Sequence, residues 1–173
     1  MDSWGTHVPA LAAAIKHTSG DILELGCGDY STPLIHALAD GRRVLSVEHN
    51  DEWLRRYTGL LSPHHSVMHV PDWDEFIASR FVSECPWGLI VVDHGPGDRR
   101  ADDLRRLVSF GSVFVIHDTD ASCYGWGDVM KLFGWVYTYT RWETWTTVAG
   151  HGDRPAWPDL LVPGAWGLSQ PWR

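Results

Sequence analysis

The chain has 173 residues, of which 44% are hydrophobic and 21% charged, and its formal net charge is −8 at pH 7. These values predict one globular domain that buries about 70% of its unfolded surface. The acidic balance excludes a non-specific nucleic-acid binder, and no apolar run reaches the ~18 residues of a membrane span. The cysteines Cys27, Cys85 and Cys123 include no C-x-x-C pair, so we expect a reducing, cytoplasmic location.

Apolar runs separated by turn residues predict alternating helices and strands. The first helix is expected to begin at Thr6 or His7 and to be terminated by Gly20, so that it lies within an N-terminal helical segment, 1–19. Thr32 is expected to cap the helix after the first strand. The predicted strands are 21–25, 44–47, 66–70, 89–92, 113–116, 135–140 and 144–149, the last two forming a hairpin.

The predicted strands are continuously apolar, which indicates burial on both faces in a parallel sheet between helices. The pattern therefore predicts an α/β fold, a doubly wound sheet of seven strands that is mostly parallel and ends in an antiparallel hairpin. Residues 1–150 would form this domain. Residues 151–173, with four prolines and three tryptophans, would form an irregular tail packed on it. The late tryptophans would cover the core or form a lid or platform for a ligand: Trp126, Trp142, Trp157, Trp166 and Trp172.

A glycine-rich turn follows the first strand, in the sequence Glu-Leu-Gly-Cys-Gly at 24–28. Gly26 and Gly28 allow the backbone to approach a ligand closely. Twenty residues past Gly28 the second strand ends in Glu48, a carboxylate that can bind both ribose hydroxyls. Ser31 stands where a dinucleotide fingerprint needs its third glycine, which disfavours a nicotinamide-dependent oxidoreductase. The turn therefore predicts a site for a nucleoside without a pyrophosphate.

The other strand ends also carry polar residues, and ligands bind at this edge of a doubly wound sheet. Inside the first strand, Glu24 is expected to accept hydrogen bonds from the turn or to help place the charged end of a cofactor. The strand ends together form a predicted binding rim from 26–29, Glu48, Asp72, 93–94 and 117–118.

These motifs resemble those of class I S-adenosylmethionine-dependent methyltransferases, over roughly residues 20–150. The resemblance rests on 24–28, Glu48, Asp72 and the strand end Val92-Asp93, together with the terminal hairpin of that Rossmann-like fold. It implies S-adenosyl-L-methionine as cofactor, bound by Glu24, Gly26, Cys27, Gly28, Glu48, His49, Asp72, Trp73 and Asp93. Gly26 and Gly28 would pass beneath the methionine part, and Glu48 would bind the ribose. Asp72 and Trp73 would border the adenine, where Trp73 would stack on the purine or serve as a core anchor.

Asp93 and Asp118 end adjacent predicted strands, so their carboxylates are expected to converge on one cation. This pair is similar to the metal site of cation-dependent small-molecule O-methyltransferases, which implies Mg²⁺ or another divalent cation. His94 and His117 depart from that pattern and would admit Mn²⁺, Fe²⁺ or Zn²⁺. The alternative is metal-free catalysis with His94 or His117 as general base. The catalytic candidates are Asp93, His94, His117 and Asp118.

The sequence thus predicts an S-adenosylmethionine-dependent methyltransferase that O-methylates a hydroxyl of a small molecule or glycan unit. The alternative is a non-catalytic S-adenosylmethionine-binding module that serves as a partner or regulatory subunit. Arg99 and Arg100 would contact an anionic substrate group or begin a solvated helix. No membrane partner and no non-specific nucleic-acid partner is expected, and a homodimer is compatible with the sequence.

Overall fold

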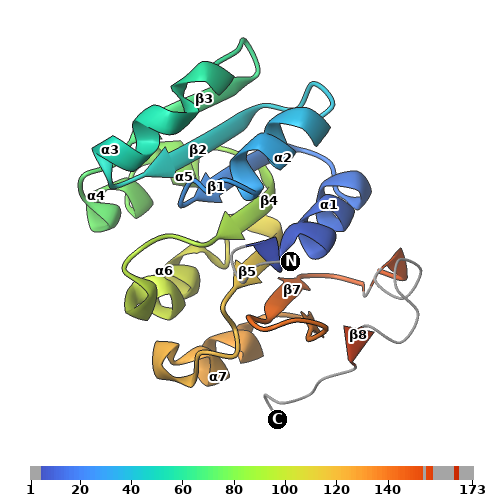
Figure 1. Cartoon of the computed structure of the whole chain (residues 1–173). Coiled ribbons are helices and arrows are strands. Elements are labelled where there is room, and N and C mark those ends of the chain that lie inside the picture. The colour runs from blue at the N-terminus through green and yellow to red at the C-terminus, as the bar shows by residue number, and fades with distance from the viewer. Residues whose placement is uncertain (1–4, 154, 158–165, 168–173) are drawn as a thin grey trace.

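An eight-stranded sheet organises the computed structural model, which describes residues 5–153, 155–157 and 166–167 (Figure 1). The spatial order of the strands is β3-β2-β1-β4-β5-β7-β6-β8. The first five in this order are parallel, and the pairs β5–β7, β7–β6 and β6–β8 are antiparallel. The strand bounds are β1 Asp21–Leu25, β2 Val44–Glu48, β3 His65–His69, β4 Trp87–Val92, β5 Gly111–His117, β6 Trp135–Tyr139, β7 Thr146–Gly150 and β8 Trp166–Gly167.

The predicted α/β class, with seven strands and a terminal antiparallel hairpin, is confirmed. β3 begins one residue earlier than expected and β4 two residues earlier. β8 adds a two-residue strand on β6, within the segment that was expected to be irregular. The stretches 158–165 and 168–173 of that segment lie outside the described residues, so the predicted division into a domain and a tail stays a prediction.

Helices cover both faces of the sheet (Figure 1). Their bounds are α1 Val8–His17, α2 Ser31–Leu38, α3 Asp51–Leu54, α4 Trp73–Ile77, α5 Arg80–Ser83, α6 Arg100–Leu107 and α7 Trp126–Val129. Short 3₁₀ turns are η2 Arg55–Leu60, η3 Gly97–Arg99, η4 Ser122–Tyr124 and η5 Met130–Leu132. No described helix combines the length and the apolar character that crossing a membrane requires.

Alternate residues of the central strands enter two separate cores, which explains their continuous apolar sequence. Ile22 of β1 packs with α1 and α2, whereas its neighbour Leu23 packs on the other face with α4, α6 and α7. Trp126 is 1% exposed and belongs to the second of these cores, and Trp157 is 7% exposed with its ring stacked on His17. These two tryptophans therefore cover the core, the first of the two roles considered for them.

Candidate functional site

A cavity of about 890 Å³ opens at the carboxyl ends of the central parallel strands. Seven of the predicted site residues line it: Cys27, Gly28, Glu48, His49, Asp93, His117 and Asp118. The lining also contains Asp29, which belongs to the predicted rim. It further contains seven residues that were not predicted as rim, catalytic, cofactor or metal residues: His7, Tyr30, Asn50, Trp53, Gly95, Arg100 and Thr144. Four of the five predicted strand ends thus meet in one space, as the parallel topology requires.

Glu48, at the end of β2, is held by the backbone around it. The Cys27 N–H donates to Oε2 (3.1 Å), and the Asn50 N–H donates to Oε1 (2.9 Å). The Nδ1 atom of His49 lies 2.9 Å from Oε1. A carboxylate has about four acceptor positions, so three partners leave room for a further hydroxyl. The side chain is oriented before a ligand arrives, and it ties the glycine turn to the start of α3.

Trp53 forms an aromatic wall of the cavity beside Glu48. Its indole N–H donates to the Cys27 carbonyl (2.6 Å), and the Arg56 guanidinium lies 3.9 Å from the ring centroid. The side chain is 36% exposed. Trp53 was not among the predicted site residues, although an aromatic residue in the first helical turn after Glu48 was an available signal.

Gly26 is required by the close approach of β1 and β4. Its φ is +91°, and a Cβ there would lie 2.6 Å from the backbone oxygen of Asp93 and from the Cα of His94. Gly26 therefore does not line the cavity with the other predicted turn residues. It sets the path of the turn that carries Cys27 and Gly28.

Gly26→Ala is expected to lower the free energy of unfolding by about 2 kcal/mol, from left-handed backbone strain and the steric contact with β4. Urea denaturation measures this. Gly127→Ala is the matched control, because the described structure shows open space around Gly127 and it lies inside α7. If both variants are equally stable, the close approach does not require glycine.

Glu24 is 0% exposed and lies below the turn, outside the cavity lining. The Thr32 hydroxyl donates to Oε1 (3.1 Å), and the Ser46 hydroxyl donates to Oε2. Thr32 in turn accepts from the Gly28 N–H (2.9 Å). Tyr30 is the N-cap residue of α2, and Thr32 lies inside the helix. Thr32 therefore does not cap the helix as predicted, and instead it connects Glu24 to the glycine turn at Gly28. Burial raises the pKa of Glu24 to about 7 despite these hydrogen bonds.

Asp93, His117 and Asp118 meet at the ends of β4 and β5. His117 Nδ1 lies 3.2 Å from Asp93 Oδ1 and 3.3 Å from Asp118 Oδ1. Its Nε2 lies 3.0 Å from the hydroxyls of both Thr6 and Thr144. Burial alone lowers the pKa of His117, but the hydrogen bond and charge of Asp93, with the charge of Asp118, outweigh it and raise that pKa. Both ring nitrogens are engaged within the protein.

Arg100 joins the two carboxylates. Its Nη2 lies 3.0 Å from Asp93 Oδ1, and its Nη1 lies 2.8 Å from Asp118 Oδ2. Nε and Nη2 also donate to the backbone carbonyls of His94 (2.6 Å) and Asp93 (3.1 Å). Burial would raise the pKa of Asp93, but His117, Arg100 and His7 outweigh it and lower that pKa. Arg100 was expected to contact an anionic substrate group or to begin a solvated helix, whereas in the structure it is the counter-ion of Asp93 and Asp118.

The arrangement does not fit the predicted divalent cation between Asp93 and Asp118. A guanidinium bonded to one oxygen of each carboxylate already supplies the positive charge there. A hard cation at the same place would have to displace Arg100, which is 7% exposed and also bonded to two backbone carbonyls.

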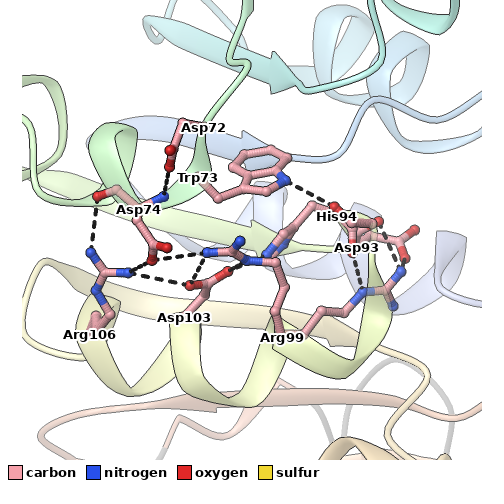
Figure 2. Close-up of polar contacts among 10 residues, drawn as sticks. Asp72, Trp73, Asp74, Asp93, His94, Arg99, Asp103 and Arg106 are labelled. Carbon is pink, nitrogen blue, oxygen red and sulfur yellow. Dashed lines mark hydrogen bonds and ion pairs between the residues drawn. The ribbon is translucent and has the colours of Figure 1, made fainter.

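His94 is 0% exposed and lies beside Trp73 and Asp103 (Figure 2). Its Nε2 lies 2.8 Å from Asp103 Oδ2, and Arg99 Nε donates to the same oxygen (2.5 Å). The ring packs against Trp73 with centroids 4.6 Å apart. Burial lowers the pKa of His94, and the hydrogen bond and charge of Asp103 offset only part of that effect. The described cavity lining excludes His94, so it does not meet the other catalytic candidates.

Asp72 and Trp73 also lie outside the described cavity lining. Asp72 caps α4 by accepting from the backbone N–H groups of Asp74 (2.7 Å) and Glu75 (3.1 Å). Trp73 is 3% exposed, and its indole N–H donates to the Gly95 carbonyl (2.9 Å). Of the two roles considered for Trp73, the structure shows the core anchor (Figure 2).

His7, which immediately precedes α1, is a cavity residue that sequence reasoning treated only as a helix start. It is 3% exposed, and its ring meets that of His117 edge to face, with centroids 4.7 Å apart. Burial lowers the pKa of His7 to about 4, although the negative charges of Asp93 and Asp118 act to raise that pKa. No motif marks this residue, because its place depends on how α1 packs against the carboxyl end of β5.

No protein-family profile matches the chain, and no curated protein is similar to it in sequence. Solved structures are similar in fold. Human methyltransferase-like protein 13 in complex with SAH has a TM-score of 0.66 at 19% identity, covering 93% of this chain and 88% of that one. A provisionally assigned O-methyltransferase from Klebsiella pneumoniae has a TM-score of 0.62 at 17% identity, with 86% and 80% covered.

A spermidine synthase in complex with the transition-state analogue AdoDATO has a TM-score of 0.59 at 15% identity. The match covers 90% of this chain but only 61% of the synthase, so the chain spans less than two thirds of that protein. The TM-scores and coverages of the two methyltransferases show that the chain has the fold of class I S-adenosylmethionine-dependent methyltransferases.

Proposed function

We propose that this protein is an S-adenosylmethionine-dependent methyltransferase. The proposal rests on one cavity that joins the Gly28 turn and Glu48 to the polar cluster of Asp93, His117 and Asp118. Its volume, about 890 Å³, lies near the upper end of the ~300–1,000 Å³ range of small-molecule sites. That volume is compatible with a cofactor and part of an acceptor at the same time.

The cofactor would lie along the β1–β2 side of the cavity, and it supplies an electrophilic methyl group on sulfur. Glu48 would accept hydrogen bonds from ribose hydroxyls, since its carboxylate is already oriented by Cys27, His49 and Asn50. The exposed face of Trp53 would border the nucleoside. Asp93 would accept hydrogen bonds from the charged amino group, since it follows β4, the neighbour of β1, and lines the same cavity.

The acceptor would be a hydroxyl of a small molecule or glycan unit. Asp118 and Thr144 provide polar atoms on the β5–β7 side, where an acceptor hydroxyl can donate to a carboxylate. Orienting that oxygen in line with the methyl–sulfur bond is the main contribution expected of the protein. This proposal places no cation between Asp93 and Asp118, since Arg100 contacts both.

Isothermal titration with S-adenosylmethionine tests the proposal. We expect micromolar binding, weakened about 30-fold by Glu48→Ala, because charge-assisted hydrogen bonds contribute ~1.5–3 kcal/mol. Glu52→Ala is the control, because Glu52 is an exposed carboxylate of α3. Lack of micromolar binding would refute the proposal. Binding with no turnover of any hydroxyl or amine acceptor would instead favour the non-catalytic module.

A further inference from the structure

His7 is a buried histidine without a hydrogen-bond partner among the described residues. Neither Nδ1 nor Nε2 is bonded, although the residue is 3% exposed and its ring lines the cavity. Buried polar groups are almost always paired, so an orphaned imidazole indicates a partner that the protein itself does not provide.

Two other metal-ligating side chains lie beside it. One nitrogen of His7, one nitrogen of His117 and one carboxylate oxygen of Asp93 are all within 4.8 Å of one another. The three residues come from three separate places: the start of α1, the end of β4 and the end of β5. Two imidazoles and a carboxylate form a donor set typical of Zn²⁺ or Fe²⁺, with positions left open for another ligand.

We propose that His7, Asp93 and His117 bind one transition-metal ion at the β5 side of the cavity. The site differs from a cation between Asp93 and Asp118, because two imidazole nitrogens take the place of the Asp118 carboxylate. Arg100 contacts the Asp93 carboxylate at Oδ1 and the Asp118 carboxylate at Oδ2. Imidazole ligands favour Zn²⁺, Fe²⁺ or Co²⁺ over Mg²⁺, which prefers oxygen.

The surroundings orient these ligands as an outer shell does in metal sites. The hydroxyls of Thr6 and Thr144 lie 3.0 Å from His117 Nε2, so Nδ1 is directed toward Asp93. Arg100 holds Asp93 Oδ1 at 3.0 Å. A small inward movement of three groups that already face one another would bring them to bonding distance of about 2.0–2.2 Å from one ion.

The remaining coordination positions would face the cavity that also contains Glu48. One consequence rests on the proposed function: if the protein transfers methyl groups, an acceptor hydroxyl would occupy one of these coordination positions. Metal binding itself needs neither cofactor nor acceptor, and it is measured without them.

The test is titration of chelator-treated full-length protein with Co²⁺, followed by its visible absorption, with Zn²⁺ as competitor and Mg²⁺ as the hard-cation comparison. We expect one Co²⁺ per chain, displaced by Zn²⁺ and not by Mg²⁺. His7→Gln should weaken binding at least about 10-fold, since losing a ligand costs no less than losing an outer-shell partner. His7→Cys should retain Zn²⁺ binding, since a thiolate is a zinc ligand.

His64→Gln is the control, because His64 is an exposed histidine away from the cavity lining, and its affinity should equal that of the parent. No binding of Co²⁺ or Zn²⁺ at micromolar concentrations overturns the proposal, as does equal binding by parent and His7→Gln. S-adenosylmethionine titration of the metal-free protein is a separate measurement. If the metal titration shows no binding and S-adenosylmethionine binds, only the metal site is refuted. If S-adenosylmethionine does not bind and the metal does, only the proposed function is refuted.

Discussion

Arg100→Met is expected to lower the free energy of unfolding by about 3 kcal/mol. Arg100 is 7% exposed and is the counter-ion of both Asp93 and Asp118. Removing one partner of a fully buried ion pair leaves an uncompensated charge, which destabilises a protein by ~3–5 kcal/mol. The cost is smaller here, because the two carboxylates are partly exposed to solvent. For a chain of this length the melting temperature should fall by roughly 10 °C. Thermal and urea denaturation measure both quantities.

Arg105→Met is the control on the same helix, since Arg105 pairs with Asp102 at the surface and should contribute no more than ~0.5 kcal/mol. Adding Asp118→Asn to Arg100→Met should recover part of the loss, because it removes one of the two unpaired charges. Equal stability of the Arg100 and Arg105 variants would show that the guanidinium is not the counter-ion of this cluster.

Stability should also fall as pH rises through the titration of Glu24. Its pKa is raised from 4.5 to about 7 by burial. Below about pH 4.5 both the folded and unfolded states are protonated. Between that pH and about 7 the unfolded state loses the proton first, so rising pH favours unfolding. A shift of this size corresponds to about 3 kcal/mol, at ~1.4 kcal/mol per pKa unit.

The measurement is urea denaturation of the parent and Glu24→Gln from pH 5 to 8. The parent should lose stability relative to the variant across this range, because glutamine fills the same place without titrating. Glu52→Gln, at an exposed carboxylate, should follow the parent at every pH. A constant difference between the parent and Glu24→Gln would mean that the carboxyl does not titrate in this range.

Most of the fold could be predicted from sequence, because the position of each strand along the chain and its burial are encoded locally. Continuously apolar runs identified the buried parallel strands, and the glycine turn with Glu48 identified the ligand edge. β8 was missed, because a two-residue strand at a sheet edge has no periodicity to detect.

The site was predicted less completely, because a strand end predicts which edge a residue reaches and not where its side chain points. His94 follows β4 directly, yet it turns into the core to meet Asp103. Asp72 was predicted as a site residue, and the structure shows it as the N-cap of α4. Trp53, which was not predicted as a site residue, lines the cavity from the four-residue helix α3.

By itself, the sequence determined the layered α/β fold, the glycine turn and the acid Glu48, because each depends on residues within one βαβ unit. Only the tertiary structure decided how charges are paired at the other side of the cavity. Arg100, Asp118 and His7 are far apart in the chain, and they meet because α6, β5 and the start of α1 pack at the same edge of the sheet. That packing gives both Asp93 and Asp118 the Arg100 guanidinium and places the unpaired imidazole of His7 beside Asp93, and no local pattern encodes it.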